Sequence, residues 1–240
     1  MISKNQIKLI TSLQQKKYRK QEQLFFVEGV KGVQELLDSN FELHELFTTK
    51  SDFTSIDTNK VHIITESELR KVSVLTTPNS CLAVFKIPKA ISYEQKGLII
   101  ALDDVRDPGN LGTIIRLCDW FGTKILFCSE ESVDVYNPKV VQATMGSMSR
   151  VNVVYGNLEQ FILGAKLPVF GTFMNGSTIY KEKLPTEGII VMGNEANGIS
   201  KPIENLVSKR IAIPRFGDLQ ATESLNVATA TAIILSEFKR

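Results

Sequence analysis

Polar side chains that could bind or activate a ligand gather in three short stretches of this sequence. The stretches are "DDVRDPGNLGTIIR" (103–116) with Asn110 and Arg116, "VMGNEANGIS" (191–200) with Glu195, and "ESLNVATATA" (223–232) with Ser224 and Asn226. A carboxylate, a guanidinium, amides and a hydroxyl can together hold a polar substrate and accept a proton. Simpler roles stay open: Ser224 and Asn226 are good helix caps, and Arg116 could be a surface residue with its stem on the protein.

Other residue types offer little chemistry. The three cysteines, Cys81, Cys118 and Cys128, are odd in number and form no C-x-x-C pair. With only His44 and His62 beside them, we expect neither a disulfide framework nor a metal site. Both histidines precede residue 65, and we interpret them as surface or strand residues rather than as catalysts.

Composition is that of an ordinary globular protein. The 240 residues are 43% hydrophobic and 22% charged, with a net charge of +2, which allows one large or two small domains. Since no apolar run reaches the roughly 18 residues of a membrane span, and the N-terminus lacks a secretory signal, we expect a cytoplasmic protein without a membrane partner.

The first twenty residues are basic and contain no acid. They carry Lys4, Lys8, Lys16, Lys17, Arg19 and Lys20. Such a segment is a candidate contact for nucleic-acid phosphates, with a solvated surface as the alternative.

The second half alternates short apolar runs with amphipathic segments. We predict strands at 98–102, 124–128, 151–154, 168–173, 189–193 and 210–213, and helices at 111–121, 139–147, 158–165, 200–207 and 225–238. Several runs are continuously apolar, which is typical of strands covered on both faces. The alternation predicts an α/β fold with a parallel sheet, and 177–187 is expected to be an irregular connection.

The first half predicts a smaller α/β unit. It begins with a strand, "LFFVEG", and an amphipathic helix up to residue 39, and it contains a capping box at "TESE" (65–68). The polar, aperiodic segment "PKAISYEQKG" ends this part. We therefore predict domains at 1–88 and 98–240, joined by a linker at 89–97.

The three polar stretches each follow a predicted strand. In open parallel sheets, ligands bind outside the carboxyl ends of the strands, so we expect the three loops to converge on one site. Gly193 and Gly198 would allow close backbone approach or a positive φ in the second loop. We expect Asn110 to cap a helix that starts near Leu111. No G-x-G-x-x-G motif opens a helix, which argues against an ordinary dinucleotide-binding enzyme.

In this order, the three loops resemble the motifs of the SpoU (TrmH-like) family of the SPOUT class of RNA methyltransferases. Asp107 to Gly112 with Arg116 looks like the first motif, "GNE" with "GIS" looks like the second, and "IP" followed by "ESLNVA" looks like the third. "NPKVVQATMGSMSRV" is similar to the family's additional helix, and "FFVEGVKGVQELL" resembles its small substrate-binding domain.

The resemblance implies a 2′-O-ribose methyltransferase that uses S-adenosylmethionine, works as a homodimer and carries a deep trefoil knot in its SPOUT fold. By similarity, Gly193, Ile213, Leu225 and Thr172 would hold the methyl donor, and Asn110, Arg116, Glu195, Ser224 and Asn226 would face the target ribose. The resemblance leaves the base open. A guanidinium is effectively never deprotonated, so we assign Arg116 to the RNA phosphate and the forming oxyanion, with Glu195 or the phosphate as proton acceptor.

Two departures and three alternatives complete the interpretation. The stretch between Pro214 and Ser224 is longer than in many relatives, and Gln142 replaces a residue that is often basic. Ribosomal RNA is the expected substrate, with transfer RNA as the alternative. A non-catalytic RNA-binding assembly protein would have lost Arg116, Glu195 or Asn226, which are present. A Rossmann-type enzyme acting on a small metabolite lacks its glycine motif.

Overall fold

The computed structural model describes residues 1–50, 53–54, 56–89, 93–217 and 224–240. Contacts divide the chain into two units, one of Met1–Ala90 with Asp134–Ser149 and the other of Ile91–Val133 with Arg150–Arg240. Our predicted boundaries place 134–149 in the second domain, whereas its contacts group it with the first unit. Residues 90–92 of the predicted linker lie outside the described residues.

The first unit is built on a four-stranded mixed sheet in the order β1-β4-β2-β3. Its strands are β1 (Leu24–Glu28), β2 (Leu43–Thr48), β3 (Val61–Ile63) and β4 (Cys81–Lys86). β4 runs antiparallel to both neighbours, while β2 and β3 are parallel. The predicted capping box opens α4 (Glu66–Leu69), where Thr65 and Glu68 bond reciprocally to each other's backbone N–H.

The basic N-terminal segment folds into two helices that the sequence analysis did not predict, α1 (Lys4–Ser12) and α2 (Lys16–Glu22). Ser3 and Gln6 form a second capping box at the start of α1. Ile2, Ile10 and Leu13 are buried against residues of the sheet. The segment is therefore part of the hydrophobic core of the first unit.

Helix α3 (Val30–Leu37) and segment 134–149 complete this unit. Within the segment, Tyr136 packs on Phe25 of β1 at 4.7 Å between ring centroids. Its helix α6 (Pro138–Thr144) is shorter than the predicted 139–147, because Met145 and Gly146 take positive φ angles of 51° and 95°. A left-handed residue ends a helix, and a short 3₁₀ turn, η2 (Ser147–Ser149), follows.

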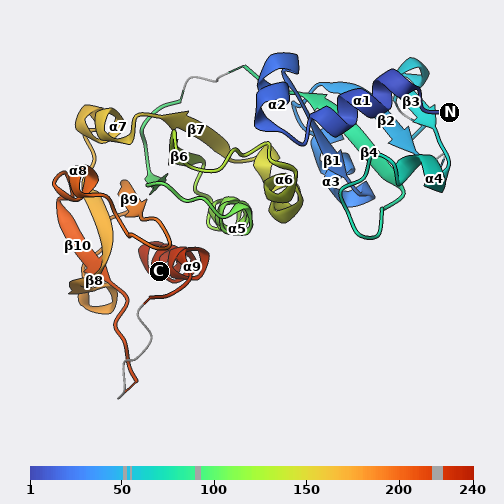
Figure 1. The fold of residues 1–240 in the computed structure, drawn as a ribbon. Helices are drawn as coiled ribbons and strands as arrows, with labels where there is room; N and C mark the ends of the chain where they lie inside the picture. Colours follow the sequence, from blue (N-terminus) through green and yellow to red (C-terminus); the bar gives the residue numbers. More distant parts are fainter. Residues whose placement is uncertain (51–52, 55, 90–92, 218–223) are drawn as a thin grey trace. The chain divides into compact units, whose positions relative to one another are not determined.

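The second unit has six parallel strands in the order β10-β8-β9-β5-β6-β7 (Figure 1). They are β5 (Leu98–Leu102), β6 (Ile125–Ser129), β7 (Asn152–Gly156), β8 (Val169–Thr178), β9 (Gly188–Met192) and β10 (Lys209–Ala212). Five coincide with predicted strands to within two residues, while β8 continues to Thr178, five residues beyond its predicted end. Between β8 and β9 the described chain forms only a 3₁₀ turn, η3 (Ile179–Lys181), so the predicted irregular connection is confirmed.

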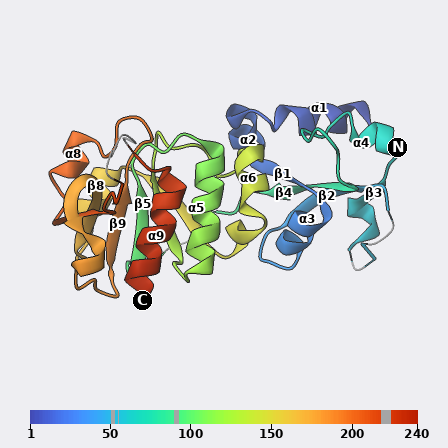
Figure 2. The ribbon, with the colours of Figure 1, turned by 90° about the horizontal axis from the view of Figure 1, so that it is seen from below.

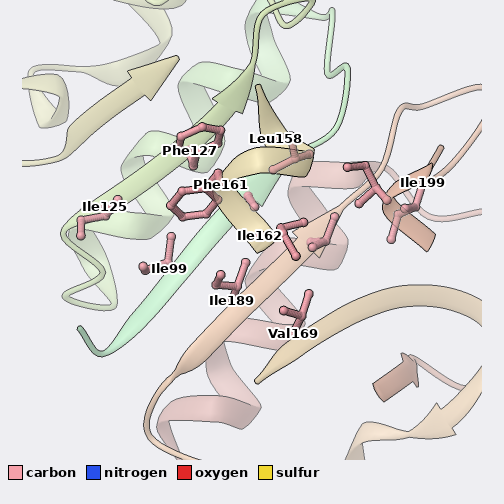
Figure 3. Packing of buried hydrophobic residues seen from close by; sticks show 12 residues of the cluster. Ile99, Ile125, Phe127, Leu158, Phe161, Ile162, Val169, Ile189 and Ile199 are labelled. Carbon is pink, nitrogen blue, oxygen red and sulfur yellow. The ribbon is translucent and has the colours of Figure 1, made fainter. Parts of the chain in front are cut away.

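Helices cover both faces of this sheet. α5 (Pro108–Trp120) and α9 (Val227–Lys239) lie side by side on one face (Figure 2), where Phe238 packs edge-on against Phe170 at 5.2 Å. On the other face, Phe161 of α7 (Leu158–Gly164) packs with Phe127, Ile99 and Ile189 of the strands (Figure 3). Ile203 of α8 (Lys201–Glu204) is buried in the same cluster. The rings of Phe161 and Phe127 stack at 3.9 Å. This two-sided burial explains the continuously apolar strands.

The α/β fold class is confirmed, while the trefoil knot remains a prediction. The passage from β10 to α9 includes residues 218–223, which lie outside the described residues. Among the helices of the described chain, none has the length and apolar character needed to cross a bilayer.

Candidate active site

The first loop leads from β5 into α5, and here one prediction is wrong. The helix begins at Pro108 rather than near Leu111, and its N-cap is Asp107, whose Oδ1 accepts a hydrogen bond from the Asn110 N–H at 2.8 Å. Proline at the first helical position suits a helix start, because its missing N–H would have no partner there. Asn110 is thus a residue of the first turn, and its side chain is available to the site.

The second loop, after β9, doubles back on itself. Asn194 and Gly198 exchange two backbone hydrogen bonds of 2.9 Å, and Gly198 has the positive φ of 69° that we expected at a glycine. A Cβ on Gly193 would overlap the peptide between Gly198 and Ile199, well inside the 3.0 Å that real Cβ atoms respect. Only glycine fits this close approach.

Two side chains that the sequence analysis missed hold the first and second loops together. The amide of Asn194 donates to the Asp104 carbonyl at 2.6 Å, and the buried Asp103 carboxylate accepts from the Ser200 N–H at 2.7 Å. The partners are 90 and 97 residues apart in the chain. Aspartate and asparagine are common in turns, so their residue types alone did not indicate this role.

The third loop leads into α9. Asn226 is the N-cap, and its Oδ1 accepts from the Ala228 and Thr229 N–H groups at 3.0 and 3.1 Å. The capping role considered for Asn226 is therefore confirmed. Ser224 lies two residues before the cap and is exposed, so it does not cap this helix.

Three of the predicted polar residues, one from each loop, form a continuous hydrogen-bond chain. The Asn110 amide donates to Glu195 Oε1 at 2.8 Å, and the Asn226 amide donates to Asn110 Oδ1 at 2.8 Å. β5 and β9 are neighbours from which the chain proceeds to opposite sides of the sheet. Such a switch point is where open α/β sheets place their ligand sites.

Arg116 lies further along α5 and is exposed. No ion pair joins it to another described residue, and it is not among the residues that line the cavity described below. Arg106, in the first loop, pairs with Asp104 at 2.7 Å. The hydrogen bond to Asp104 raises the pKa of Arg106 above its ordinary value, and the charge of Glu195 contributes in the same direction.

A cavity of about 1200 Å³ is lined by the second and third loops and by residues of β8, and Glu195 connects its wall to the hydrogen-bonded series of side chains. Its walls include the four residues predicted to hold the methyl donor, Thr172, Gly193, Ile213 and Leu225. Glu195 and Ser224 line the same cavity. The remaining wall is largely apolar, with Ile211, Val227 and Ile234 among its members, as is usual for small-molecule sites.

The described residues offer little support for thiol or metal chemistry. All three cysteines are buried, and burial raises the pKa of each thiol, to about 11 at Cys81. A thiol with a raised pKa is a poor nucleophile. Within the part of the chain that the structure describes, no group of three histidine, cysteine or acidic residues could hold a metal ion.

The basic residues predicted to bind RNA divide into two kinds. Lys16, Lys17 and Lys20 are exposed on α2. Arg19 is only 2% exposed; its Nη2 and Nε bind Asp134 Oδ2 at 2.5 and 2.9 Å, and its Nη1 donates to the Leu13 and Gln14 carbonyls. Because the guanidinium is enclosed and makes these four hydrogen bonds inside the protein, Arg19 is a structural residue here, and the prediction that it binds RNA is corrected.

Fold and site together define an α/β protein with a cavity at the carboxyl ends of a parallel sheet, where the Glu195 carboxylate accepts from the Asn110 amide, which in turn accepts from the Asn226 amide. The SpoU rRNA Methylase family matches residues 97–236, and an MRM3-like substrate binding domain matches residues 4–83. The chain belongs to the SpoU rRNA Methylase family.

Individual relatives cover nearly the whole chain. The 23S rRNA (guanosine(2553)-2′-O)-methyltransferase RlmP of Bacillus subtilis is 30% identical over 97% of this chain and 96% of its own. A solved structure from Porphyromonas gingivalis, assigned to the TrmH family of RNA methyltransferases, is 40% identical with a TM-score of 0.90, covering 99% of this chain and 98% of that one. An AdoMet-bound rRNA methyltransferase from Sinorhizobium meliloti is 29% identical with a TM-score of 0.88, covering 100% of this chain and 96% of its own.

Proposed function

We propose that this protein transfers a methyl group from S-adenosylmethionine to the 2′-oxygen of a ribose in ribosomal RNA. One observation carries the proposal. The second and third motif loops line a single cavity, and Asn110 of the first loop, 85 residues before Glu195, is joined to its wall by the hydrogen-bonded series Glu195–Asn110–Asn226. The RNA substrate follows the family and the 23S rRNA activity of the B. subtilis relative.

The cavity suits an adenosine with a charged tail. Its apolar walls can cover a purine, and its floor is bare backbone at Gly193, where a side chain has no room. We assign Gly193, Ile213 and Leu225 to the donor, with Thr172 beside them. The Thr172 hydroxyl donates to the Val191 carbonyl at 3.0 Å, which couples the two strands that frame the cavity. Bound there, S-adenosylmethionine supplies an electrophilic methyl group.

Polar side chains of this protein position the ribose and accept the proton of its 2′-hydroxyl. Glu195 accepts the 2′-hydroxyl proton, since it lines the cavity and only accepts hydrogen bonds when ionised. Arg116 binds the phosphate next to the target and stabilises the developing negative charge on the 2′-oxygen. Ser224, exposed at the cavity wall, hydrogen-bonds the same nucleotide. Alignment of the oxygen with the methyl carbon then provides much of the rate enhancement.

RNA binding also uses the first unit. Lys16, Lys17 and Lys20 present three exposed cations on α2, and their contribution is expected to weaken with rising salt. Arg19 is left out of this set for the structural reason given above.

We further propose that the protein is a homodimer that forms through the outer surface of α5 and α9. Trp120 on α5 is 84% exposed, although tryptophan is a residue that interfaces preferentially bury. Sedimentation velocity should give a dimer for the wild type and a monomer for Trp120→Glu. A wild-type monomer would refute the proposal.

Mass-spectrometric mapping of ribose methylation tests the function. Ribosomal and transfer RNA are compared from cells with the gene, without it, and complemented with wild-type protein or Glu195→Gln. We expect one 2′-O-methyl site in ribosomal RNA to disappear without the gene and to return with the wild type only. A site lost from transfer RNA instead would replace the substrate, and an unchanged methylation map would refute the reaction.

A further inference from the structure

The first turn of α9 determines how the side-chain amides of Asn226 and Asn110 are oriented in the hydrogen-bonded series Asn226–Asn110–Glu195. Asn226 faces the N–H groups of Ala228 and Thr229, and backbone N–H groups can only donate. The oxygen of the Asn226 amide must therefore point at the helix, and its NH₂ group must point away. This orientation is fixed by partners and does not depend on telling nitrogen from oxygen.

The orientation of Asn226 in turn determines the orientation of Asn110. The NH₂ group of Asn226 requires an acceptor, so Asn110 presents Oδ1 to it at 2.8 Å. The NH₂ group of Asn110 is then turned toward Glu195, where Oε1 accepts at 2.8 Å. Any single reversal would bring two NH₂ groups or two oxygens face to face. The chain therefore has one stable direction, from the helix end to the carboxylate.

We propose that Asn226 and Asn110 are positioning residues, which use the end of α9 to aim Glu195 as the proton acceptor of the methyl-transfer reaction. The proposal rests on the proposed function. Oε1 is held by Asn110, and no described residue occupies Oε2, on a side chain that lines the cavity. The backbone beneath Glu195 is itself fixed by the Asn194–Gly198 bonds and by Asn194 on Asp104.

In the reaction, the proton of the ribose 2′-hydroxyl moves to Glu195 Oε2. The electron pair of the broken O–H bond stays on the ribose oxygen, which forms the new bond to the methyl carbon. The electron pair of the sulfur–carbon bond stays on sulfur, which becomes a neutral thioether. Glu195 returns its proton to water after the product leaves.

A first experiment separates aiming from capping. Asn226→Ser keeps an oxygen that can cap α9 but loses the NH₂ group that reaches Asn110. We expect kcat to fall by about 10–100-fold, because proton transfer by a positioned group is worth that much or more. The KM for RNA and the Kd for S-adenosylmethionine should stay within about twofold, since neither ligand loses a contact.

Asn157→Ser is the matched control. Asn157 caps α7 in the same way, accepting from the Gln160 N–H at 2.9 Å, and it lies outside the chain of three residues. This variant should keep the wild-type kcat. An Asn226→Ser variant with unchanged kcat, or one that loses RNA and donor affinity as much as kcat, would overturn the proposal.

A second experiment reverses the direction of the chain and needs no activity. Asn226→Asp still caps α9, but its carboxylate only accepts, so Asn110 must turn its NH₂ group toward it and its oxygen toward Glu195. We expect Tm to fall by about 2–4 °C, as one unfavourable contact would cause in a chain of this size. Adding Glu195→Gln should restore Tm, because the glutamine amide can donate to the reversed Asn110.

Glu195→Gln alone should change Tm little, since glutamine can present its oxygen to Asn110. Strictly additive Tm changes across these variants would show that the three side chains are not coupled, and would overturn the proposal even if the methylation experiment succeeds. If the Tm changes show that the three side chains are coupled but the wild type methylates no RNA, the hydrogen-bonded series has a structural role and the proposed function is refuted.

Discussion

Replacing Gly193 by alanine tests whether the shape of the cavity requires a residue without a side chain at this position. The added methyl group would overlap the peptide between Gly198 and Ile199, and ordinary van der Waals contact requires that the two segments separate by about 1 Å. That separation breaks the pair of hydrogen bonds between Asn194 and Gly198, each 2.9 Å long. At about 1 kcal/mol for each bond, the free energy of unfolding should fall by about 2 kcal/mol.

For a protein of this size, a loss of about 2 kcal/mol lowers Tm by about 4–8 °C. The variant should therefore remain folded at 25 °C, and its ligand binding can be measured by calorimetry. Displacing the loop removes one wall of the cavity, so we expect the Kd for S-adenosylmethionine to rise at least tenfold, about 1.4 kcal/mol.

Gly217→Ala provides the matched control. Gly217 also lines the cavity, but a Cβ there meets no atom within 4 Å. This variant should keep the wild-type Tm and affinity. Our reasoning is refuted if Gly193→Ala binds the donor as tightly as Gly217→Ala and melts at the same temperature.

Three further predictions concern single side chains. Arg116→Ala should abolish methyl transfer while the calorimetric Kd for the donor stays within a few-fold, and an equal loss of both would make Arg116 structural. Arg19→Ala should lower the free energy of unfolding in urea by about 3–5 kcal/mol, because Asp134 and two carbonyl groups lose their hydrogen-bond donor. Lys17→Ala should instead weaken RNA binding and leave the free energy of unfolding unchanged. If Lys17→Ala destabilises the protein and Arg19→Ala only weakens RNA binding, the two roles are reversed. Burial raises the pKa of Glu28 above its ordinary 4.5, although hydrogen bonds from Ser73 and Val74 oppose the shift. As pH rises, Glu28 therefore loses its proton in the unfolded protein before it does so in the folded protein. Its contribution to the free energy of unfolding falls as pH rises above about 4.5. Urea titrations between pH 4.5 and 8 should therefore show Glu28→Gln gaining stability relative to the wild type as pH rises, and a constant difference would contradict this.

Local sequence patterns were sufficient for most of the second unit. The β5 and β9 runs, Leu98–Leu102 and Gly188–Met192, are continuously apolar because helices cover both their faces, and that pattern is visible in any single strand. Two errors had usable signals. Asp107 followed by proline marks the true start of α5, and the S-x-x-Q pattern from Ser3 to Gln6 marks α1.

Other features depend on partners that are distant in the chain. Arg19 resembles its basic neighbours in sequence, and only Asp134, 115 residues later, makes it a buried structural residue. Asn226 and Asn110 are 116 residues apart, so the direction of their hydrogen bond cannot be deduced from either loop alone. A resemblance identified these residues as a group, but their connection required the three-dimensional arrangement.

The grouping of residues 134–149 with the first unit has a consequence for protein engineering. A chimera that exchanges only residues 1–90 with a relative would pair a foreign sheet with the original Tyr136 and Asp134, which now pack on Phe25 and bind Arg19. Transplanting the first unit from one relative to another therefore requires both pieces. A chimera with its single crossover at the linker 89–97 would contain a first unit that lacks its own segment 134–149.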